Sequence, residues 1–410
     1  MSKWKEYKLG DLIDVKHGFA FKGECITTEP TSNILVTPGN FNIGGGFKIT
    51  KFKYYYGQYP ESYILKEGDV VVTMTDLSQE GDTLGYSAKI PKQDGFKFLH
   101  NQRIGLVNII SDEADKDFIY WTMRTYEYQG FIVGAATGTS IRHTSPTTIK
   151  EYTFQLPPMP EQKSIASILN SLDDKIDLLH RQNKTLEALA ETLFRQWFVE
   201  EENTEIVVLE RLVDVIDNRG KTPKFSDVKT DYPIIEVKSL ASADRFVNYE
   251  ACEKFVTEGT YKNWFRAGHP IVNDILFSTV GSIGEMAFVI ENKGAIAQNV
   301  VGLRAKKISP FYLYQYLSLP KTRGNIKNLD IGAVQPSIKV PHLLEIEIPV
   351  PIDKKQIYEF ENKMIPMFEK MKINHNQIRT LTRLRDTLLP KLMSGEVRVK
   401  KAEECVKASL

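Results

Sequence analysis

The 410-residue sequence predicts an α+β protein, in which two similar globular α/β domains are separated by two long helices. Three observations predict this organisation. A heptad-patterned segment occupies the middle of the chain, a second copy closes the chain, and the stretches before the two copies share anchor residues in the same order. We therefore expect a pseudo-twofold repeat whose parts are a first domain at 1–156, a central helix at 157–200, a second domain at 201–348, a closing helix at 349–398 and a tail at 399–410.

The central segment is predicted to be one long helix. After Pro160 no Pro or Gly occurs before Gly220, and the residues between are mostly strong helix formers. Asn183 interrupts an apolar heptad pattern at an a position, where a buried amide fixes register. The apolar positions are Ile165, Leu169, Leu172, Ile176, Leu179, Leu186, Ala190, Leu193 and Trp197. An amphipathic helix packed on a globular core is the alternative interpretation.

The closing copy also carries one Asn, Asn374, in its heptad pattern. If Asn374 lies opposite Asn183 in an antiparallel pair, nearly every neighbouring layer is apolar on both sides. Leu172 alone would face a charged residue, Arg385, whose guanidinium would have to reach out to water. We therefore predict an intramolecular antiparallel coiled coil in this register, with layers that pair Leu179 with Ile378, Ile176 with Leu381 and Leu186 with Met371.

Each globular segment mixes strand and helix patterns. The β-branched runs DVVVTMT (69–75) and DILFSTV (274–280) predict buried strands. Helical spacing is found in 115–128 and 309–319. We expect each domain to end in a strand that leads into the prolines, at 150–157 and at 343–349. The aromatic stretches KFKYYYGQY (51–59) and KFVTEGTYKNWF (254–265) are compatible with strands or loops.

Composition excludes several classes of protein. The charges nearly cancel, with 53 Lys and Arg against 52 Asp and Glu, so any nucleic-acid contact must come from local patches. The three cysteines are too far apart for a disulfide framework or a zinc site, and we expect no metal. No apolar run approaches membrane-spanning length, and the start MSKWKEYKLG lacks the apolar core of a signal peptide. The expected compartment is therefore the cytoplasm.

Sequence motifs for catalysis are missing. The chain has no glycine-rich loop of the Rossmann or Walker type, no G-x-S-x-G and no H-E-x-x-H. The Asp/Asn-Pro-Pro-aromatic motif of amino-methyltransferases is also missing, because Leu156 and Met159 flank the two prolines at 157–158. We therefore predict a binding protein and not an enzyme.

Basic and aromatic residues mark candidate DNA-binding positions in the first domain. Lysines that run into tyrosines have the composition that contacts phosphate and flanks bases, although an ordinary exposed strand can look the same. A small polar loop at 138–143 adds Arg and His. The candidates are Lys48, Lys51, Lys53, Tyr54, Tyr55, Ser140, Arg142 and His143.

The second domain has a basic turn at 218–224 and a loop at 332–337 that occupies the same place in the repeat as 138–143. Arg suits guanine and Gln suits adenine in the major groove, although any of these positions could also be solvated surface. The candidates are Arg219, Lys221, Thr222, Lys224, Arg323, Lys327 and Gln335.

Several motifs together resemble the specificity subunit of type I restriction-modification systems. They are the start W-x-x-x-x-L-G-D-L at 4–12, the helix entry LPPMPEQKSIASIL at 156–169, the turn DNRGKTP at 217–223 and the closing LLPKLMSGEV at 388–397. Each is loose alone, but their order and duplication are specific to the family.

The resemblance implies a non-catalytic, sequence-specific DNA-binding subunit. Each globular domain would be a target recognition domain that reads one half of a bipartite sequence on double-stranded DNA. The helices would dock two methyltransferase subunits, which restriction subunits join. S-adenosylmethionine, ATP and Mg would then belong to the partner subunits, with no cofactor or small-molecule substrate on this chain. The competing hypothesis is a non-catalytic adaptor with two interaction domains on a coiled-coil spacer and no DNA role.

Overall fold

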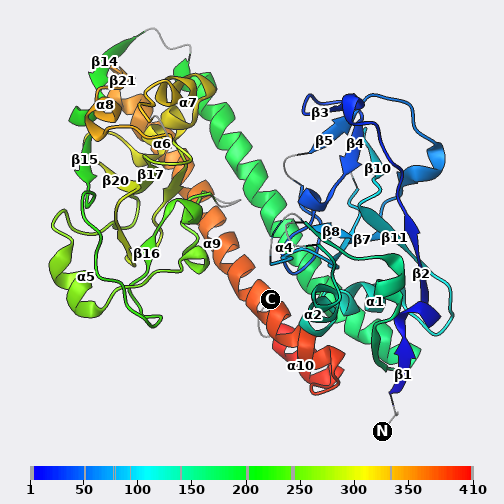
Figure 1. Cartoon of the computed structure of the whole chain (residues 1–410). Coiled ribbons are helices and arrows are strands. Elements are labelled where there is room, and N and C mark those ends of the chain that lie inside the picture. The colour runs from blue at the N-terminus through cyan, green and yellow to red at the C-terminus, as the bar shows by residue number, and fades with distance from the viewer. Residues whose placement is uncertain are drawn as a thin grey trace. The chain divides into compact units, whose positions relative to one another are not determined.

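The computed structural model describes residues 4–49, 52–76, 78, 80–92, 94–138, 141–199, 203–241, 245–332 and 335–407. The chain divides into two compact units. Unit 1 comprises Met1–Ile176 with Thr380–Leu410, and unit 2 comprises Asp177–Arg379. Both boundaries fall inside the long helices, so each unit contains a globular domain and part of each helix (Figure 1).

Unit 1 is built on two sheets. The four-stranded antiparallel sheet has the order β2-β11-β7-β9, with β2 (Ile13–His17), β11 (Ile104–Ile109), β7 (Val70–Thr73) and β9 (Ser87–Lys89). The five-stranded sheet has the order β3-β5-β4-β10-β6, with β3 (Ile26–Thr27), β5 (Lys53–Tyr55), β4 (Asn33–Val36), β10 (Lys97–His100) and β6 (Ile64–Leu65). The remaining elements are β1 (Lys5–Lys8) paired with β13 (Thr153–Leu156), β12 (Arg142–His143) paired with β8 (Thr75–Asp76), α1 (Lys116–Thr122), α2 (Tyr126–Gly134) and α3 (Pro146–Lys150).

Unit 2 repeats this scaffold. Its four-stranded sheet has the order β15-β20-β17-β18, with β15 (Val213–Ile216), β20 (Val300–Ala305), β17 (Ile275–Ser278) and β18 (Met286–Phe288). The parallel pair β16 (Ile234–Ile235) and β19 (Ala295–Ile296) corresponds to the parallel pair β4 and β10. The other elements are β14 (Thr204–Val208) paired with β21 (Glu347–Pro351), α5 (Glu258–Trp264), α6 (Pro310–Ser318), α7 (Pro320–Lys327) and α8 (Val340–Leu344).

The predicted strands and helices of the domains are present, with one correction. The runs at 69–75 and 274–280 form the buried strands β7 and β17. The stretch 254–265, expected to be strand or loop, contains the helix α5 instead. Thr257 caps this helix, because its side chain accepts the backbone N–H of Thr260 at 3.2 Å.

The two long helices are α4 (Met159–Phe194) and α9 (Lys354–Met393), green and orange in Figure 1. A short π-helical segment, Arg195–Val199, ends the first of them. The stretch predicted to be a tail contains a further helix, α10 (Val399–Lys407), on which Ala402 is fully buried. None of the helices described is both long and apolar enough to span a bilayer.

In unit 2 the two long helices pair through the predicted asparagines. Asn374 Nδ2 donates to Asn183 Oδ1 at 2.9 Å, and both side chains are buried. Further along, the rings of Trp197 and Phe360 lie 6.4 Å apart. Since the contact residue on α9 moves backward as the residue on α4 moves forward, the two segments are antiparallel.

In unit 1 the helices are joined by a carboxylate held between two guanidinium groups. Asp173 on α4 lies 2.6 Å from Arg385 of α9 and 2.6 Å from Arg124, which follows α1. Burial opposes ionisation of Asp173, but the two arginines overcome this effect and lower the pKa of its carboxyl. The guanidinium of Arg385, expected to reach out to water beside Leu172, is instead ion-paired and largely buried.

The helices also complete the domain core. In unit 2 one continuous apolar cluster combines side chains of α4 and α9 with those of the sheet and of α6. Phe194 contacts both Tyr312 and Phe360, with ring centroids 5.1 and 5.8 Å apart. The long helices therefore form part of this domain's hydrophobic core as well as connecting the two units along the chain.

The asparagine layer can be tested by a double-mutant cycle. Replacing Asn374 alone by Leu leaves Asn183 buried without its partner, and we expect a loss of about 1–3 kcal/mol in the free energy of unfolding. The double variant, Asn183→Leu with Asn374→Leu, should recover most of this loss because neither polar group remains. Urea denaturation gives the free energy of unfolding of the wild type, of Asn183→Leu, of Asn374→Leu and of the double variant. Additive losses in the double variant would contradict a direct pairing.

His100 should make stability depend on pH. Burial lowers the pKa of its imidazole to about 4, and Nε2 lies 2.8 Å from the carbonyl oxygen of Ile104. Between pH 6.5 and 4 the unfolded chain binds a proton that the folded chain does not, so stability present above pH 6.5 is lost as pH falls. At 1.36 kcal/mol for each unit of pKa, the loss is about 3 kcal/mol.

The comparison variant is His100→Gln, whose amide can still donate to Ile104 but does not titrate. Urea denaturation at pH 7 and pH 4 should show a smaller acid-induced loss in this variant than in the wild type. Equal losses in the two proteins would show that His100 does not set this part of the pH dependence.

Candidate nucleic-acid interface

In unit 1 several loops leave the four-stranded sheet at one edge. The carboxyl ends of β2 and β7 meet the amino end of β11 there, since His17 pairs with Gly105 and Thr73 with Ile104. We call the described parts of 17–22, 74–83, 101–103 and 137–143 the loop edge of unit 1. The opposite end of the sheet, where Ile13 pairs with Ile109, is its far edge.

Backbone hydrogen bonds join these loops to one another. The backbone N–H of Met74 donates to Arg103 at 2.9 Å, and that of Gln102 donates to Phe19 at 3.0 Å. The 137–143 loop is attached through β12, on which His143 Nδ1 lies 3.1 Å from the hydroxyl of Thr75. The loop edge is therefore fixed mainly by hydrogen bonds.

A buried carboxylate braces the turn after β8. Asp76 accepts the hydroxyl of Thr83 at 2.6 Å and the backbone N–H of Ser78 at 2.7 Å. Burial opposes its ionisation, but these donors outweigh burial and lower the pKa of Asp76. The negative carboxylate lies directly across the β8–β12 pair from Arg142, its register partner.

Unit 2 has an equivalent edge, where Ile216 pairs with Gly302 and Ser278 with Val300. We call the described parts of 217–224, 278–284, 297–299 and 331–338 the loop edge of unit 2. Thr279 connects three of these loops. Its backbone N–H donates to Asn299 at 2.8 Å, its carbonyl accepts from Ile338 at 2.9 Å, and its hydroxyl accepts from Arg219 at 3.3 Å.

The structure brings most of the predicted residues of the second domain together on this loop edge. Arg219 is half-buried and ion-paired with Asp217 at 2.8 Å. The exposed members are Lys221, Thr222, Lys224 and Gln335. Arg323 and Lys327 lie instead on α7, whose buried Ile326 belongs to the apolar cluster against which Ile283 of the 278–284 loop packs.

In unit 1 the predicted residues fall into two groups. Arg142, half-buried, and His143, exposed, lie on the loop edge, whereas Ser140 and Lys51 fall outside the described residues. Exposed Lys53 begins β5 opposite Leu35, at the carboxyl end of β4. Because β4 runs parallel to β10, which leads into 101–103, Lys53 lies at the same edge in the neighbouring sheet. Lys48, also exposed, is in the loop between β4 and β5.

The prediction for Tyr55 needs a correction. Tyr54 is half-buried, but Tyr55 is only 1% exposed, and its ring packs against Phe21 at 4.8 Å between centroids. The cause is the position of β5 inside its sheet, since alternate residues of the strand point to the core. Tyr55 therefore belongs to the core of unit 1 and not to its surface.

Sequence reasoning missed the turns that precede β11 and β20, which in chain order are the last strands of the two four-stranded sheets. Exposed Gln102 and Arg103 precede β11, and exposed Gln298 and Asn299 lie just before β20. The sequence does contain a signal, because 101–106 and 298–303 occupy matching places in the two copies.

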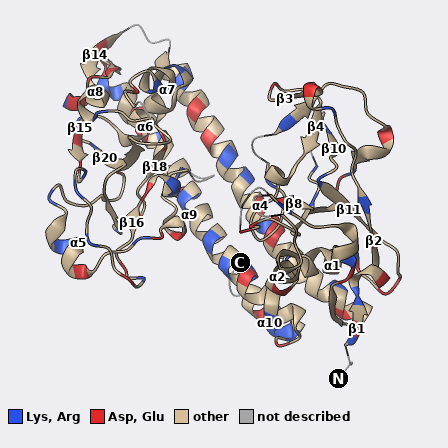
Figure 2. Cartoon of the chain, viewed as in Figure 1, with Lys and Arg blue, Asp and Glu red and all other residues tan. Residues whose placement is uncertain are grey.

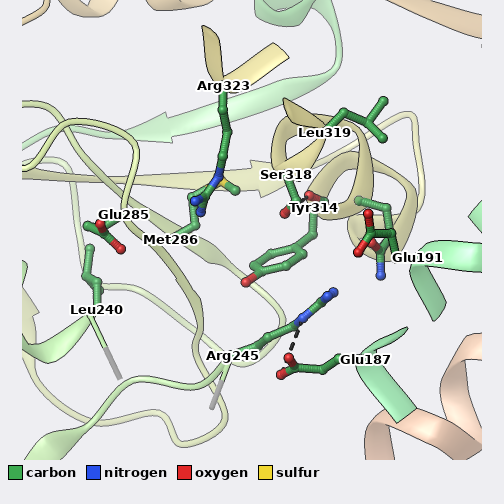
Figure 3. Close-up of a pocket in the computed structure, with 11 residues that line it drawn as sticks. Glu187, Glu191, Leu240, Arg245, Glu285, Met286, Tyr314, Ser318, Leu319 and Arg323 are labelled. Carbon is green, nitrogen blue, oxygen red and sulfur yellow. Dashed lines mark hydrogen bonds and ion pairs between the residues drawn. The ribbon is translucent and has the colours of Figure 1, made fainter. Parts of the chain in front are cut away.

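A pocket of about 260 Å³ in unit 2 is a second candidate site (Figure 3). Arg245 lies over the ring of Tyr314, 5.1 Å from its centroid, and its guanidinium is 3.4 Å from Glu187 of α4. Arg323 points into the same pocket, which Glu285 and Glu191 also line. The ion pair between Arg245 and Glu187 attaches this part of the domain to α4. The lining carries both acidic and basic side chains, so its charge does not favour a ligand of one sign.

Charge is spread widely over the chain. Figure 2 shows Lys and Arg interspersed with Asp and Glu on both long helices. Within the described residues no cluster of His, Cys, Asp and Glu could hold a metal ion. The loop edges present exposed basic and amide side chains from several loops.

Comparisons with known proteins agree with this architecture. The family model for the type I restriction modification DNA specificity domain matches residues 1–188 and again 201–379. The EcoBI specificity subunit of Escherichia coli is 23% identical over 96% of this chain and 86% of its own length. The HindI specificity subunit of Haemophilus influenzae is 22% identical over 97% of this chain and 100% of its own length. The solved S subunit from M. genitalium shares the fold, with a TM-score of 0.57, 18% identity and coverage of 95% of this chain and 96% of that one.

Proposed function

Since this chain belongs to the type I restriction modification DNA specificity family and is a specificity subunit, we propose that it reads a bipartite sequence on double-stranded DNA. The loop edge of each unit contacts one half of the target. The subunit itself performs no catalysis, and partner subunits modify or cut the DNA it selects.

One observation carries this proposal. The same sheet order occurs twice, and in both copies the same edge presents exposed polar and basic side chains that differ between the copies. Arg142 and His143 lie in the unit 1 loop that corresponds to the unit 2 loop carrying Gln335. Arg pairs well with guanine and Gln with adenine, so two such edges suit two different half-sites.

The overall charge supports a need for partners. Affinity for DNA rises with the number of phosphates that a protein neutralises, and this chain has a net charge of only +1. We expect weak binding by the isolated subunit and tight binding by the assembled complex. The methyltransferase subunits would contribute most of the additional phosphate contacts.

The long helices supply surfaces for those partners. Both helices expose large apolar side chains that no described residue covers, and such exposed groups are typical of interaction sites. The exposed apolar side chains include Leu178 and Leu189 on α4, and Tyr358, Ile365 and Ile373 on α9. We assign methyltransferase docking to these surfaces, with the restriction subunits joining the assembly.

The cofactors are assigned to the partners as well. The sequence contains no glycine-rich phosphate loop and no methyltransferase motif. S-adenosylmethionine, ATP and Mg would therefore bind the methyltransferase and restriction subunits. This chain would determine only where on the DNA their chemistry takes place.

Methylome sequencing tests the proposed function. A host that carries the chain with its neighbouring methyltransferase gene should show methylation at one bipartite sequence, and deletion of this chain should abolish it. Arg142→Ala should relax one half of the target and Gln335→Ala the other, each by about 1–3 kcal/mol of discrimination. The control is Lys307→Ala. Lys307 follows β20 at the end of the unit 2 sheet opposite the loop edge, which is the far edge of unit 2, and its replacement should leave both halves unchanged. If the wild type directs no sequence-specific methylation, the adaptor hypothesis is favoured.

A further inference from the structure

Two non-glycine residues among those described have a positive φ. Asn273 has φ 75° and Gln298 has φ 61°, a region that side chains with a Cβ rarely adopt. Glycine would occupy either position without this strain. A strained residue that persists where glycine would fit better often serves a function.

The two residues lie at opposite edges of the same sheet. Asn273 precedes β17 at the far edge, and its backbone N–H donates to Val289 at 2.9 Å. Asn is one of the few residues that tolerate this conformation. Gln298 precedes β20 at the loop edge, and Gln lacks that tolerance. Its strain is sustained by the surrounding loops, because the next residue, Asn299, bonds through its carbonyl to Thr279.

The side chain of Gln298 is exposed, so it does not offset the strain by filling the core. Its Nε2 donates to the hydroxyl of Thr222, in the basic turn at 218–224. A carboxamide has two N–H donors and a carbonyl acceptor. The contact with Thr222 uses one donor, and the described residues provide no partner for the other donor or for Oε1.

A free N–H beside a free carbonyl oxygen is the combination that reads adenine in the major groove. The oxygen accepts from N6 of the base and the N–H donates to N7. Exposed Lys221 lies next to Thr222 in the sequence, and a lysine is a residue type that contacts phosphate. Gln298 therefore combines a strained backbone with an exposed side chain that contacts Thr222 and keeps a free donor and acceptor.

We infer that Gln298 is a specificity-determining residue that reads an A·T pair in the half-site recognised by unit 2, with Thr222 orienting its amide. This inference rests on the proposed function and adds a base-contacting residue to it. Gln298 supplies the contact to the base, and Thr222 is a positioning residue.

The test compares Gln298→Gly with Asn273→Gly in the chain assembled with its methyltransferase partners. Both substitutions relieve the same kind of backbone strain, but only the first removes an amide from the loop edge. The substrates are duplexes that carry the site mapped for the wild type, and variants of that site with a single base-pair change at each position of either half. The readouts are the rate of methyl transfer on each duplex and the melting temperature of the chain.

Both glycine variants should melt at an unchanged temperature or about 2–4 °C higher, since strain is relieved in each. Gln298→Gly should lose about 5- to 150-fold in discrimination at one A·T pair of a single half-site. Asn273→Gly should discriminate like the wild type at every position. Thr222→Val should lose part of the discrimination at the same A·T pair, because the amide is no longer oriented.

The outcomes separate this inference from the proposed function. If Gln298→Gly discriminates like the wild type at every position, Gln298 does not read a base, although the proposed function stands. If it melts at a lower temperature and loses rate equally on all duplexes, its role is structural and the inference is wrong. If the wild type itself does not distinguish its mapped site from the substituted duplexes, the proposed function fails first.

Discussion

The pairing of α4 with α9 is the interaction on which the rest of the structure depends. The buried contact between Asn183 and Asn374 fixes which residues of the two helices face each other in unit 2. Those helices also provide Phe194, Phe360 and Met371 to the core of the unit. A shift of one helix by a single heptad would bury the two amides without each other and change the side chains that the domain packs against. Register and domain packing are therefore coupled.

The loop edges follow a different principle. Their loops are held by local hydrogen bonds. In unit 1 Thr83 and Ser78 donate to Asp76, and in unit 2 the bonds surround Thr279. Such contacts depend on the backbone and on a few small side chains, so the exposed residues between them can differ without disturbing the sheet. One scaffold can then present two unlike surfaces, as a reader of an asymmetric bipartite sequence requires.

The sequence predicted the features that repeat or have a regular period. The heptad pattern located both helices and the asparagine pair, and the anchors of the repeat predicted two domains with the same strands. Features that depend on tertiary context were missed. Tyr55 looked exposed because its neighbours are basic, but its place inside the five-stranded sheet buries it. Arg385 is held between α4 and its own neighbour Asp386, a contact that spacing along the chain does not reveal.

The candidate site was predicted in part for the same reason. Composition identified the 218–224 turn and the 138–143 loop, because basic and polar residues cluster there. It did not identify Gln102, Arg103 or Gln298, which lie in short turns between strands and join the loop edges only when the strands pair. The left-handed backbone of Gln298 is a three-dimensional property, and no composition signal marks it.

Photo-crosslinking of the assembled complex to its DNA target tests most directly the claim that each loop edge contacts one half-site. A photoreactive amino acid would replace Gln102 in unit 1 or Lys221 in unit 2, with Asp112 and Lys307 at the far edges as controls. We expect crosslinks from position 102 to one half-site and from position 221 to the other, with none from the far edges. Crosslinks from the far edges, or from both loop edges to the same half-site, would contradict it.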